Sequence, residues 1–161
     1  MARAAYSSSG NGGTTMTVTK DAGDVQVFTG ATTVQALSFS DTAEASGRVV
    51  FAGYGLVVPE AQNFGYDSYA GLEVKDKIVV VLRYFPEDAD QKTRGILARY
   101  SDLRYKAQAA RQRGAKGMIV VTGPRSPNAG AIVPMSFDTA IAGSGIAAAS
   151  VNAEAIAPIM T

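Results

Sequence analysis

The side chains that could do chemistry in this sequence are carboxylates, lysines, arginines, tyrosines and hydroxyls, because its 161 residues include no histidine and no cysteine. A Ser-His-Asp or Cys-His nucleophile system is therefore excluded, as are thiolate redox chemistry and Cys/His zinc sites. The serine signatures G-x-S-x-G and S-x-x-K are also absent from the chain. The residue types thus disfavour an enzyme that acts alone, which would have to use carboxylates and tyrosines.

Two short patterns resemble ligand sites but lack the context that such sites need. The segment GSGIAA at residues 143–148 has the G-x-G-x-x-A form of a dinucleotide loop. However, no clear strand precedes it, and too few residues follow it to supply the acidic ribose ligand. Glu87, Asp88 and Asp90 offer carboxylates to calcium, but the glycine and the distal glutamate of an EF-hand loop are missing. We expect no cofactor at the first pattern and a solvated charged loop at the second.

Aromatic residues gather beside turn residues in the middle of the chain. Tyr54 lies between two glycines, and Tyr66 and Tyr69 flank Asp67 in a segment that also contains serine and glycine. Tyrosine together with serine and glycine is a composition that recognition loops often use. The alternative, which the residues leave open, is that two or three of these rings cover the edge of a sheet.

Positive charge is concentrated between residues 83 and 125, where there are ten Lys and Arg residues against four Asp and Glu residues. The rest of the chain is negative, so the net charge is +1. A basic segment can bind an anionic partner, but the simpler interpretation is the solvated face of one helix and its loops. No ribonucleoprotein-type strand motif accompanies it, so nucleic-acid binding is not expected.

The elements that must position these residues begin with strands. Runs that alternate or are apolar, separated by small residues, predict strands at residues 15–19, 24–28, 34–39 and 47–53. Residues 77–83 and 117–122 are continuous apolar runs, which is the pattern of strands buried on both faces. A last strand is predicted at residues 146–151.

One helix is predicted between the two continuous apolar strands. The apolar residues of its stripe recur every three or four positions and are Ile96, Tyr100, Leu103, Ala107 and Ala110. Ser101 is the expected N-cap, Gly114 the expected terminator, and Arg111 and Arg113 suit the negative end of the helix dipole. A strand, a helix and a strand in this order predict a right-handed parallel crossover. Asn152 is the expected cap of a short C-terminal helix.

The two ends of the chain predict its domain organisation. Residues 1–14 contain several serines and glycines and are expected to form a flexible linker, without the apolar core of a signal peptide. Residues 15–161 are expected to form a single domain of the mixed α/β class. No apolar run approaches the roughly 18 residues of a membrane helix. The last helix stops without a C-terminal signal, so we expect a piece excised from a longer peptidase chain.

Four segments together resemble the protease-associated (PA) domain family. They are GRVVFAGYG at residues 47–55, YDSYAGLEVKDKIVVVLR at 66–83, KAQAARQRGAKGMIVV at 106–121 and GIAAASV at 145–151. The likeness covers residues 34–155, and its narrower form is to the PA domains of secreted bacterial zinc aminopeptidases, relatives of glutamate carboxypeptidase and the transferrin receptor. Ala147 departs from the pattern, because many PA domains have proline there. The resemblance implies a swivelling β/β/α fold, mostly β with one crossover helix.

The resemblance also implies a function and partners. PA domains of this type accompany a peptidase domain whose two zinc ions are held by His, Asp and Glu ligands, and this chain has no histidine to match them. It is expected to be non-catalytic and without zinc, a lid that limits access and helps to position the peptide. The expected partners are the peptidase domain and the peptide, not nucleic acid or membrane, and the expected location is extracellular or periplasmic. The alternative is an interaction or sorting module of a receptor or a subtilisin-like protease.

Six residues are the candidate contacts with the substrate or the neighbouring domain. They are Tyr54, Tyr66, Asp67, Tyr69, Arg83 and Tyr84. Arg83 and Tyr84 are included because they lie at the end of the strand that is predicted at residues 77–83. An arginine at that place can bind a peptide carboxylate through two hydrogen bonds, and it suits an ion pair between domains equally well.

Overall fold

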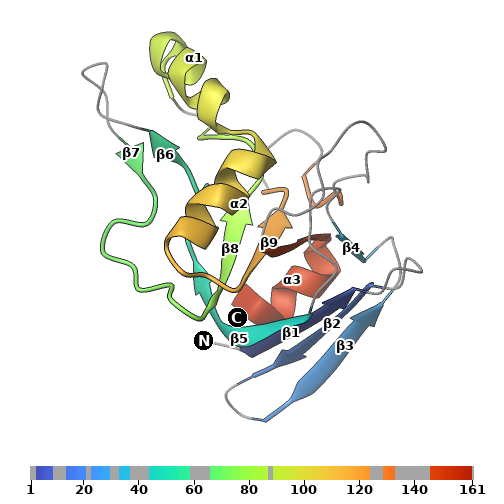
Figure 1. Ribbon diagram of the computed structural model, residues 1–161. Helices are drawn as coiled ribbons and strands as arrows, with labels where there is room; N and C mark the ends of the chain where they lie inside the picture. The colour runs from blue at the N-terminus through green and yellow to red at the C-terminus, as the bar shows by residue number, and fades with distance from the viewer. Residues whose placement is uncertain are drawn as a thin grey trace.

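One mixed sheet is the centre of the fold (Figure 1). The computed structural model describes residues 3–8, 14–20, 23–29, 33–36, 44–58, 66–86, 89–123, 129–132 and 146–160. Within them the strands are β1 (Arg3–Ser8), β2 (Thr14–Thr19), β3 (Val25–Thr29), β4 (Val34–Ala36), β5 (Glu44–Phe51), β6 (Val57–Val58), β7 (Tyr66–Asp67), β8 (Ile78–Leu82), β9 (Gly117–Val121) and β10 (Ala147–Val151). The helices are α1 (Gln91–Tyr100), α2 (Leu103–Gln112) and α3 (Ala153–Met160). The expected mixed α/β class is confirmed.

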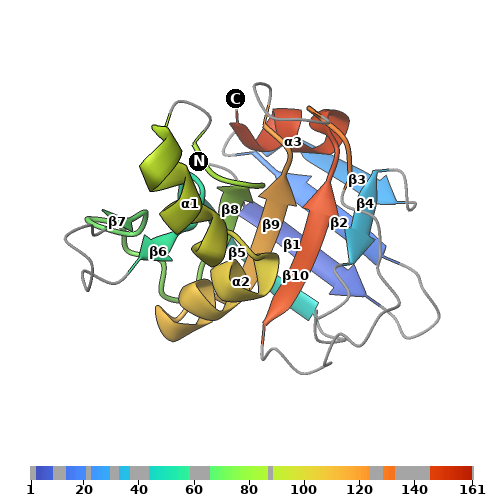
Figure 2. The same ribbon diagram turned by 90° about the horizontal axis from the view of Figure 1, so that it is seen from above.

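The sheet has an antiparallel half and a parallel half, which meet at β5. Its strand order is β3-β2-β1-β5-β8-β9-β10-β4, and β6 and β7 form a separate ladder. β1, β2 and β3 are antiparallel to their neighbours, whereas β5, β8, β9 and β10 run parallel. β4 is antiparallel to β10 and lies close to β2, so the sheet curls toward closure (Figure 2).

The concave side of the curled sheet encloses the first apolar core. Along β5, Ala45 and Val49 are buried while Ser46 and Arg48 are exposed, which is the alternation of a strand with one buried face. Met16 of β2 packs into the same core, and α3 lies across it (Figure 1). The antiparallel half therefore has its other, convex face turned away from this core.

A second apolar core lies between the parallel strands and α2. Val79 and Val81 of β8 and Val120 of β9 pack there against alanines of α2 such as Ala107. The neighbouring positions of the same strands, among them Ile119, face the first core. Both faces of β9 are thus covered and all its residues are buried, which is why the sequence there is a continuous apolar run.

The predicted single helix is divided into α1 and α2, which corrects the expected N-cap. Ser101 is the C-cap of α1, and Asp90 and Asp102 are the two N-caps. The Asp90 carboxylate accepts a hydrogen bond from the N–H of Thr93 at 2.7 Å, and that of Asp102 accepts one from the N–H of Arg104 at 2.8 Å. An aspartate directly after Ser101 starts a new helix because it satisfies N–H groups of a first turn that have no helical partner.

The expected flexible linker is wrong for the first described residues. β1 pairs with β2 on one side and with β5 on the other, and Ala4 is buried in the first core. Serine-rich composition does not prevent a strand that has two backbone partners and one buried face. Some earlier expectations fall outside the described residues: residues 9–13 of the linker, 37–39 of the third predicted strand, 143–145 of the dinucleotide-like pattern, and Glu87 and Asp88.

Candidate functional site

A glycine turn after β5 brings Tyr54 to the carboxyl-terminal edge of the parallel strands. Gly53 and Gly55 have φ values of +56° and +63°, a backbone region that favours glycine. A Cβ on Gly55 would lie 2.6 Å from Val81 Cγ1, so a larger residue does not fit. The N–H of Leu82 donates to the carbonyl of Gly53 at 2.8 Å, which joins the turn to β8. Tyr54 is half-buried beside this strand end.

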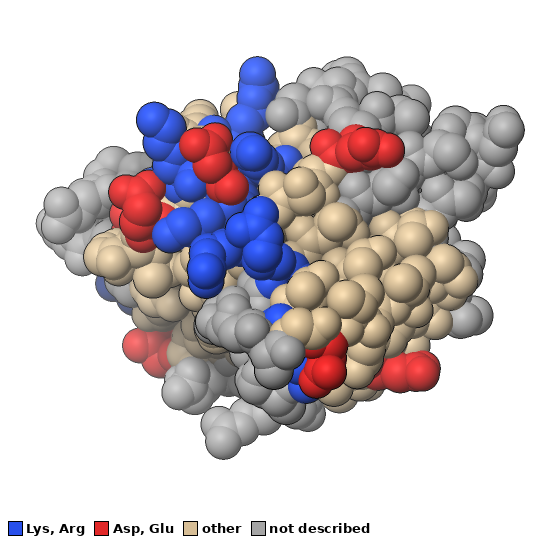
Figure 3. Space-filling model, turned by 90° about the horizontal axis from the view of Figure 1, so that it is seen from below, with Lys and Arg blue, Asp and Glu red and all other residues tan. Residues whose placement is uncertain are grey.

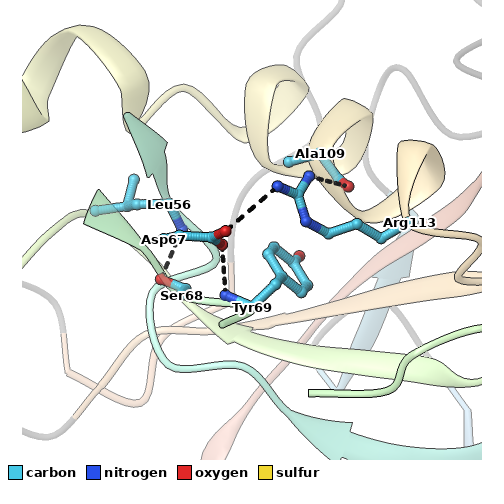
Figure 4. A network of polar contacts seen from close by, with 6 residues as sticks. All are labelled: Leu56, Asp67, Ser68, Tyr69, Ala109 and Arg113. Atoms are coloured by element: carbon cyan, nitrogen blue, oxygen red, sulfur yellow. Dashed lines mark hydrogen bonds and ion pairs between the residues drawn. The ribbon is translucent and has the colours of Figure 1, made fainter. Parts of the chain in front are cut away.

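The β6–β7 hairpin positions the next three candidates, Tyr66, Asp67 and Tyr69. The hairpin is closed by reciprocal bonds: the N–H of Leu56 donates to Ser68 Oγ at 3.0 Å, and the N–H of Ser68 donates to the carbonyl of Leu56 at 2.9 Å. The N–H of Tyr69 donates to Asp67 Oδ1 at 2.8 Å. These bonds hold the Asp67 carboxylate toward α2 (Figure 4).

Arg113, just after α2, contacts two of these residues. Its guanidinium carbon lies 5.0 Å from the centre of the Tyr69 ring, and its Nη2 lies 3.7 Å from Asp67 Oδ2. Its Nη1 donates to the carbonyl of Ala109 at 3.1 Å, so the side chain folds back along α2 (Figure 4). A partly exposed ion pair contributes little by itself, but the three contacts together fix the orientation of the guanidinium. We call Asp67, Tyr69 and Arg113 the hairpin cluster.

Sequence reasoning missed the role of Arg113. An arginine near the end of a helix is already explained by the helix dipole, so nothing local pointed to a further role. Its partners Asp67 and Tyr69 lie far upstream in the chain, and only the tertiary fold brings them under α2. The hairpin cluster therefore contains two residues that the sequence indicated and one that it did not.

Tyr69 is a buried platform and not an exposed ring. Only 4% of its surface is exposed, and its hydroxyl has no hydrogen-bond partner among the described residues. Burial raises the pKa of Tyr69 to about 12, while the charge of Arg113 lowers it and that of Asp67 raises it by smaller amounts. The phenol stays protonated near neutral pH, so Tyr69 can act on a partner only through the guanidinium that lies over its ring.

Lys106 of α2 organises the remaining candidates from inside the molecule. It is fully buried, and its Nζ donates to the carbonyl oxygens of Leu82 at 2.7 Å and of Tyr84 at 2.6 Å. The same Nζ lies 5.9 Å from the centre of the Tyr54 ring. Burial lowers the pKa of Lys106 to about 7. A buried amine needs such acceptors, and here they are the backbone at the end of β8.

The bonds from Lys106 explain the bend of the chain at Tyr84. Tyr84 has a φ of +70°, which is rare for a residue with a bulky side chain. The guanidinium carbon of Arg83 lies 4.6 Å from the centre of the Tyr84 ring, and the N–H of Arg83 donates to the carbonyl of Val121 at 2.7 Å. Arg83 and Tyr84 thus form a stacked, half-buried pair. We call Tyr54, Arg83, Tyr84 and Lys106 the strand-end cluster.

Five of the six candidates therefore fall into two groups rather than one, and Tyr66 belongs to neither cluster. Tyr66 and Tyr54 both pack against an apolar cluster that includes Leu56, Val58 and Leu97, which links the hairpin to the strand ends. Arg83 and Tyr84 contact neither Asp67 nor Tyr69 through any described hydrogen bond, ion pair or ring contact. Each group depends on a basic residue from α2 or its end.

An open groove of about 270 Å³ lies beside the hairpin cluster. Tyr100 and Tyr105, whose ring centroids are 6.2 Å apart, line one part of it, and Gln108, Gln112 and Arg113 line another. Such a lining offers aromatic surface, amide groups and one cation, which suits a polypeptide segment. The sequence pattern predicts Tyr100 on the apolar stripe of the helix and does not indicate this groove.

The described residues show where some of the groups that could do chemistry lie. They contain no set of three or more Asp or Glu side chains placed to hold a metal ion. Lys106 has a pKa near neutrality, but it is sealed from solvent and cannot reach a substrate. Within these same residues, no helix combines the length and apolar character needed to cross a bilayer.

The fold is a mixed α/β module that carries two polar and aromatic clusters, one at the β6–β7 hairpin and one at the end of β8. The family model of the PA domain matches residues 31–159 of this chain. The chain therefore belongs to the PA domain family, whose members are typically non-catalytic accessory modules. A search of curated proteins found no match.

Proposed function

We propose that this PA domain is the accessory module of a secreted zinc aminopeptidase, where it limits access to the active-site cleft and helps to position the peptide. The observation that carries the proposal is the strand-end cluster, in which Arg83 is stacked on Tyr84 and the backbone beneath them is held by Lys106. A guanidinium held in one orientation loses less conformational freedom when it binds a carboxylate.

The proposal assigns the peptide chemistry to a neighbouring peptidase domain. Two zinc ions and a general base would belong to that domain, because this chain has no histidine to supply the ligands. The role of this chain would be to exclude water and oversized substrates and to orient the peptide. An extracellular or periplasmic location is part of the same proposal, since PA domains are typical of secreted proteins.

The test is the substitution Arg83→Ala in the full-length protein. We expect KM for peptides to rise about tenfold, because a charge-assisted hydrogen bond to a carboxylate is lost. KM for a small chromogenic amide, which has no carboxylate to bind, should stay unchanged. Arg94→Ala is the matched control, since Arg94 is an exposed arginine on α1 and should leave both values unchanged.

Equal effects of Arg83→Ala on both substrates would refute the substrate contact and favour an interdomain ion pair. A full-length protein with no peptidase domain would refute the proposal itself. A membrane anchor or a subtilisin-like protease beside this domain would then support the alternative, an interaction or sorting module.

A further inference from the structure

The convex face of β1, β2, β3 and β5 is not covered by any described helix (Figure 1). The strand register places Val27, Thr17, Ala5 and Ser46 in one row across the four strands. Val27 is 61% exposed, and Ala5 and Ser46 are also exposed. These side chains are short and uncharged, so little projects from this part of the face. We call these four residues the neutral row.

Two arginines adjoin the neutral row. Arg3 of β1 and Arg48 of β5 lie opposite each other, two positions along from Ala5 and Ser46, and both are exposed. A Cβ on Gly47 would lie 2.9 Å from the carbonyl oxygen of Asp76. The loop before β8 therefore passes beside β5 at Gly47, the residue that precedes Arg48 in the chain.

Two lysines extend this positive surface. A Cβ on Gly114 would lie 3.2 Å from Lys75 Cγ, and the N–H of Lys116 donates to the carbonyl of Lys77 at 2.8 Å. The loop before β8 and the turn before β9 are therefore neighbours, and Lys75 and Lys116 are both exposed. Figure 3 shows Lys and Arg gathered on this side of the molecule, with some Asp and Glu among them, beside a surface that is mostly uncharged. We call Arg3, Arg48, Lys75 and Lys116 the basic patch.

Among the described residues, the four cations of the basic patch outnumber the two carboxylates in the loop beside it, Glu73 and Asp76. Among the described residues, no carboxylate forms an ion pair with any of its four side chains. The nearby Glu73 carboxylate accepts a hydrogen bond from the backbone N–H of Lys75 at 3.1 Å instead. An excess of charge of one sign raises the local potential and attracts a partner of opposite sign.

We propose that the basic patch and the neutral row together bind an acidic polypeptide, a contact beyond the peptide-positioning role. Glu73 and Asp76 lie in the loop beside the patch, where they would repel the closely spaced phosphates of a nucleic acid or an anionic bilayer. The acidic residues of a polypeptide can be spaced to avoid them. Its uncharged residues can also pack on the neutral row, which provides contact area that charge alone does not.

Binding of a short fluorescent peptide of glutamate and alanine to this chain tests the proposal by anisotropy. We expect salt-sensitive binding that Lys75→Glu combined with Lys116→Glu weakens about tenfold or more. The control is Lys92→Glu combined with Arg94→Glu, which makes the same charge change at two exposed residues of α1. The control should change affinity less than about twofold.

Three outcomes would overturn the proposal: no binding at low salt, equal weakening by the two double variants, or tighter binding to oligothymidylate or to phosphatidylserine vesicles than to the peptide. Circular dichroism checks that the double variants keep the thermal midpoint of the parent chain. If the lysine double variant unfolds, Lys116→Glu alone should still weaken binding more than Arg94→Glu alone.

Discussion

Two buried polar side chains with opposite surroundings lie beneath the candidate contact residues. Lys106 is fully buried, and its ammonium has two carbonyl acceptors at the end of β8. Tyr69 is almost as buried, but its hydroxyl has no partner among the described residues. Lys106 therefore determines the path of the backbone, while Tyr69 supplies a ring on which Arg113 rests. Neither side chain reaches solvent itself, and each acts through a neighbour that does.

We predict that Lys106→Met flattens the pH dependence of stability between pH 7 and 10.5. The pKa of Lys106 is lowered from 10.5 to about 7 in the folded chain, so the folded state binds fewer protons than the unfolded state in this window. The contribution of Lys106 to stability is therefore present above pH 10.5 and is lost as the pH falls to 7, by at most about 1.4 kcal/mol per pH unit. Urea unfolding of both proteins across the window measures the difference. If the free energy of unfolding changes with pH equally in the two proteins, the lowered pKa of Lys106 is contradicted.

Short connections between elements decide where the clusters lie. Ser101 caps the end of α1 and Asp102 caps the start of α2, and the break between the helices brings the rings of Tyr100 and Tyr105 together in the lining of the groove. The glycine turn after β5 is a second short connection that positions a side chain, because it holds Tyr54 against the end of β8. A continuous helix or a wider turn would separate these side chains.

Gly55→Ala should destabilise the fold by about 2–4 kcal/mol, because it adds a clash with Val81 to the strain of a positive φ. Gly53→Ala is the matched control: its φ is also positive, but a Cβ there meets nothing within 4 Å. The control should cost only about 1 kcal/mol. Urea denaturation of the two variants compares them directly, and equal losses would show that the close approach to Val81 relaxes without cost.

The curled sheet gives the whole molecule a rigid interior and a more weakly held edge. β8 and β9 lie between two apolar cores and pair with strands on both sides. β3 pairs with β2 alone in the sheet, and four of its five residues are exposed. The neutral row ends on this edge strand, so the proposed acidic partner would bind next to a strand that we expect to open easily.

Native-state hydrogen exchange should therefore be slowest in the central strands of the sheet and faster in the edge strand β3. We expect the amides of β8 and β9 to exchange last, by global unfolding, and those of β3 to exchange about a hundredfold faster or more, by local opening. The measurement is exchange followed by NMR at neutral pH. Equal protection of β3 and β9 would contradict this picture and show that the edge is covered in solution.

The sequence by itself determined the class of the fold and most of its elements. Alternation predicted β2, β3 and β5, continuous apolar runs predicted β8 and β9, and the order strand, helix, strand predicted the parallel crossover that the structure contains. These features are local, because periodicity and turn residues act over a few positions along the chain. The four quoted segments likewise indicated the PA family, which the family match confirms. The linker was wrong because β1 depends on partners that are distant in sequence.

Only the tertiary structure decided how the candidate residues are grouped. Sequence composition indicated Tyr54, Asp67 and Arg83, but it gave no reason to join Arg113 to Asp67 or Lys106 to the end of β8. It also did not show that β5 lies beside the loop before β8, which creates the basic patch. The physical reason is the same in each case: hydrogen bonds, ion pairs and burial connect residues that are close in space, and the packing of α2 on the parallel strands and the pairing of β5 with β8 set those distances.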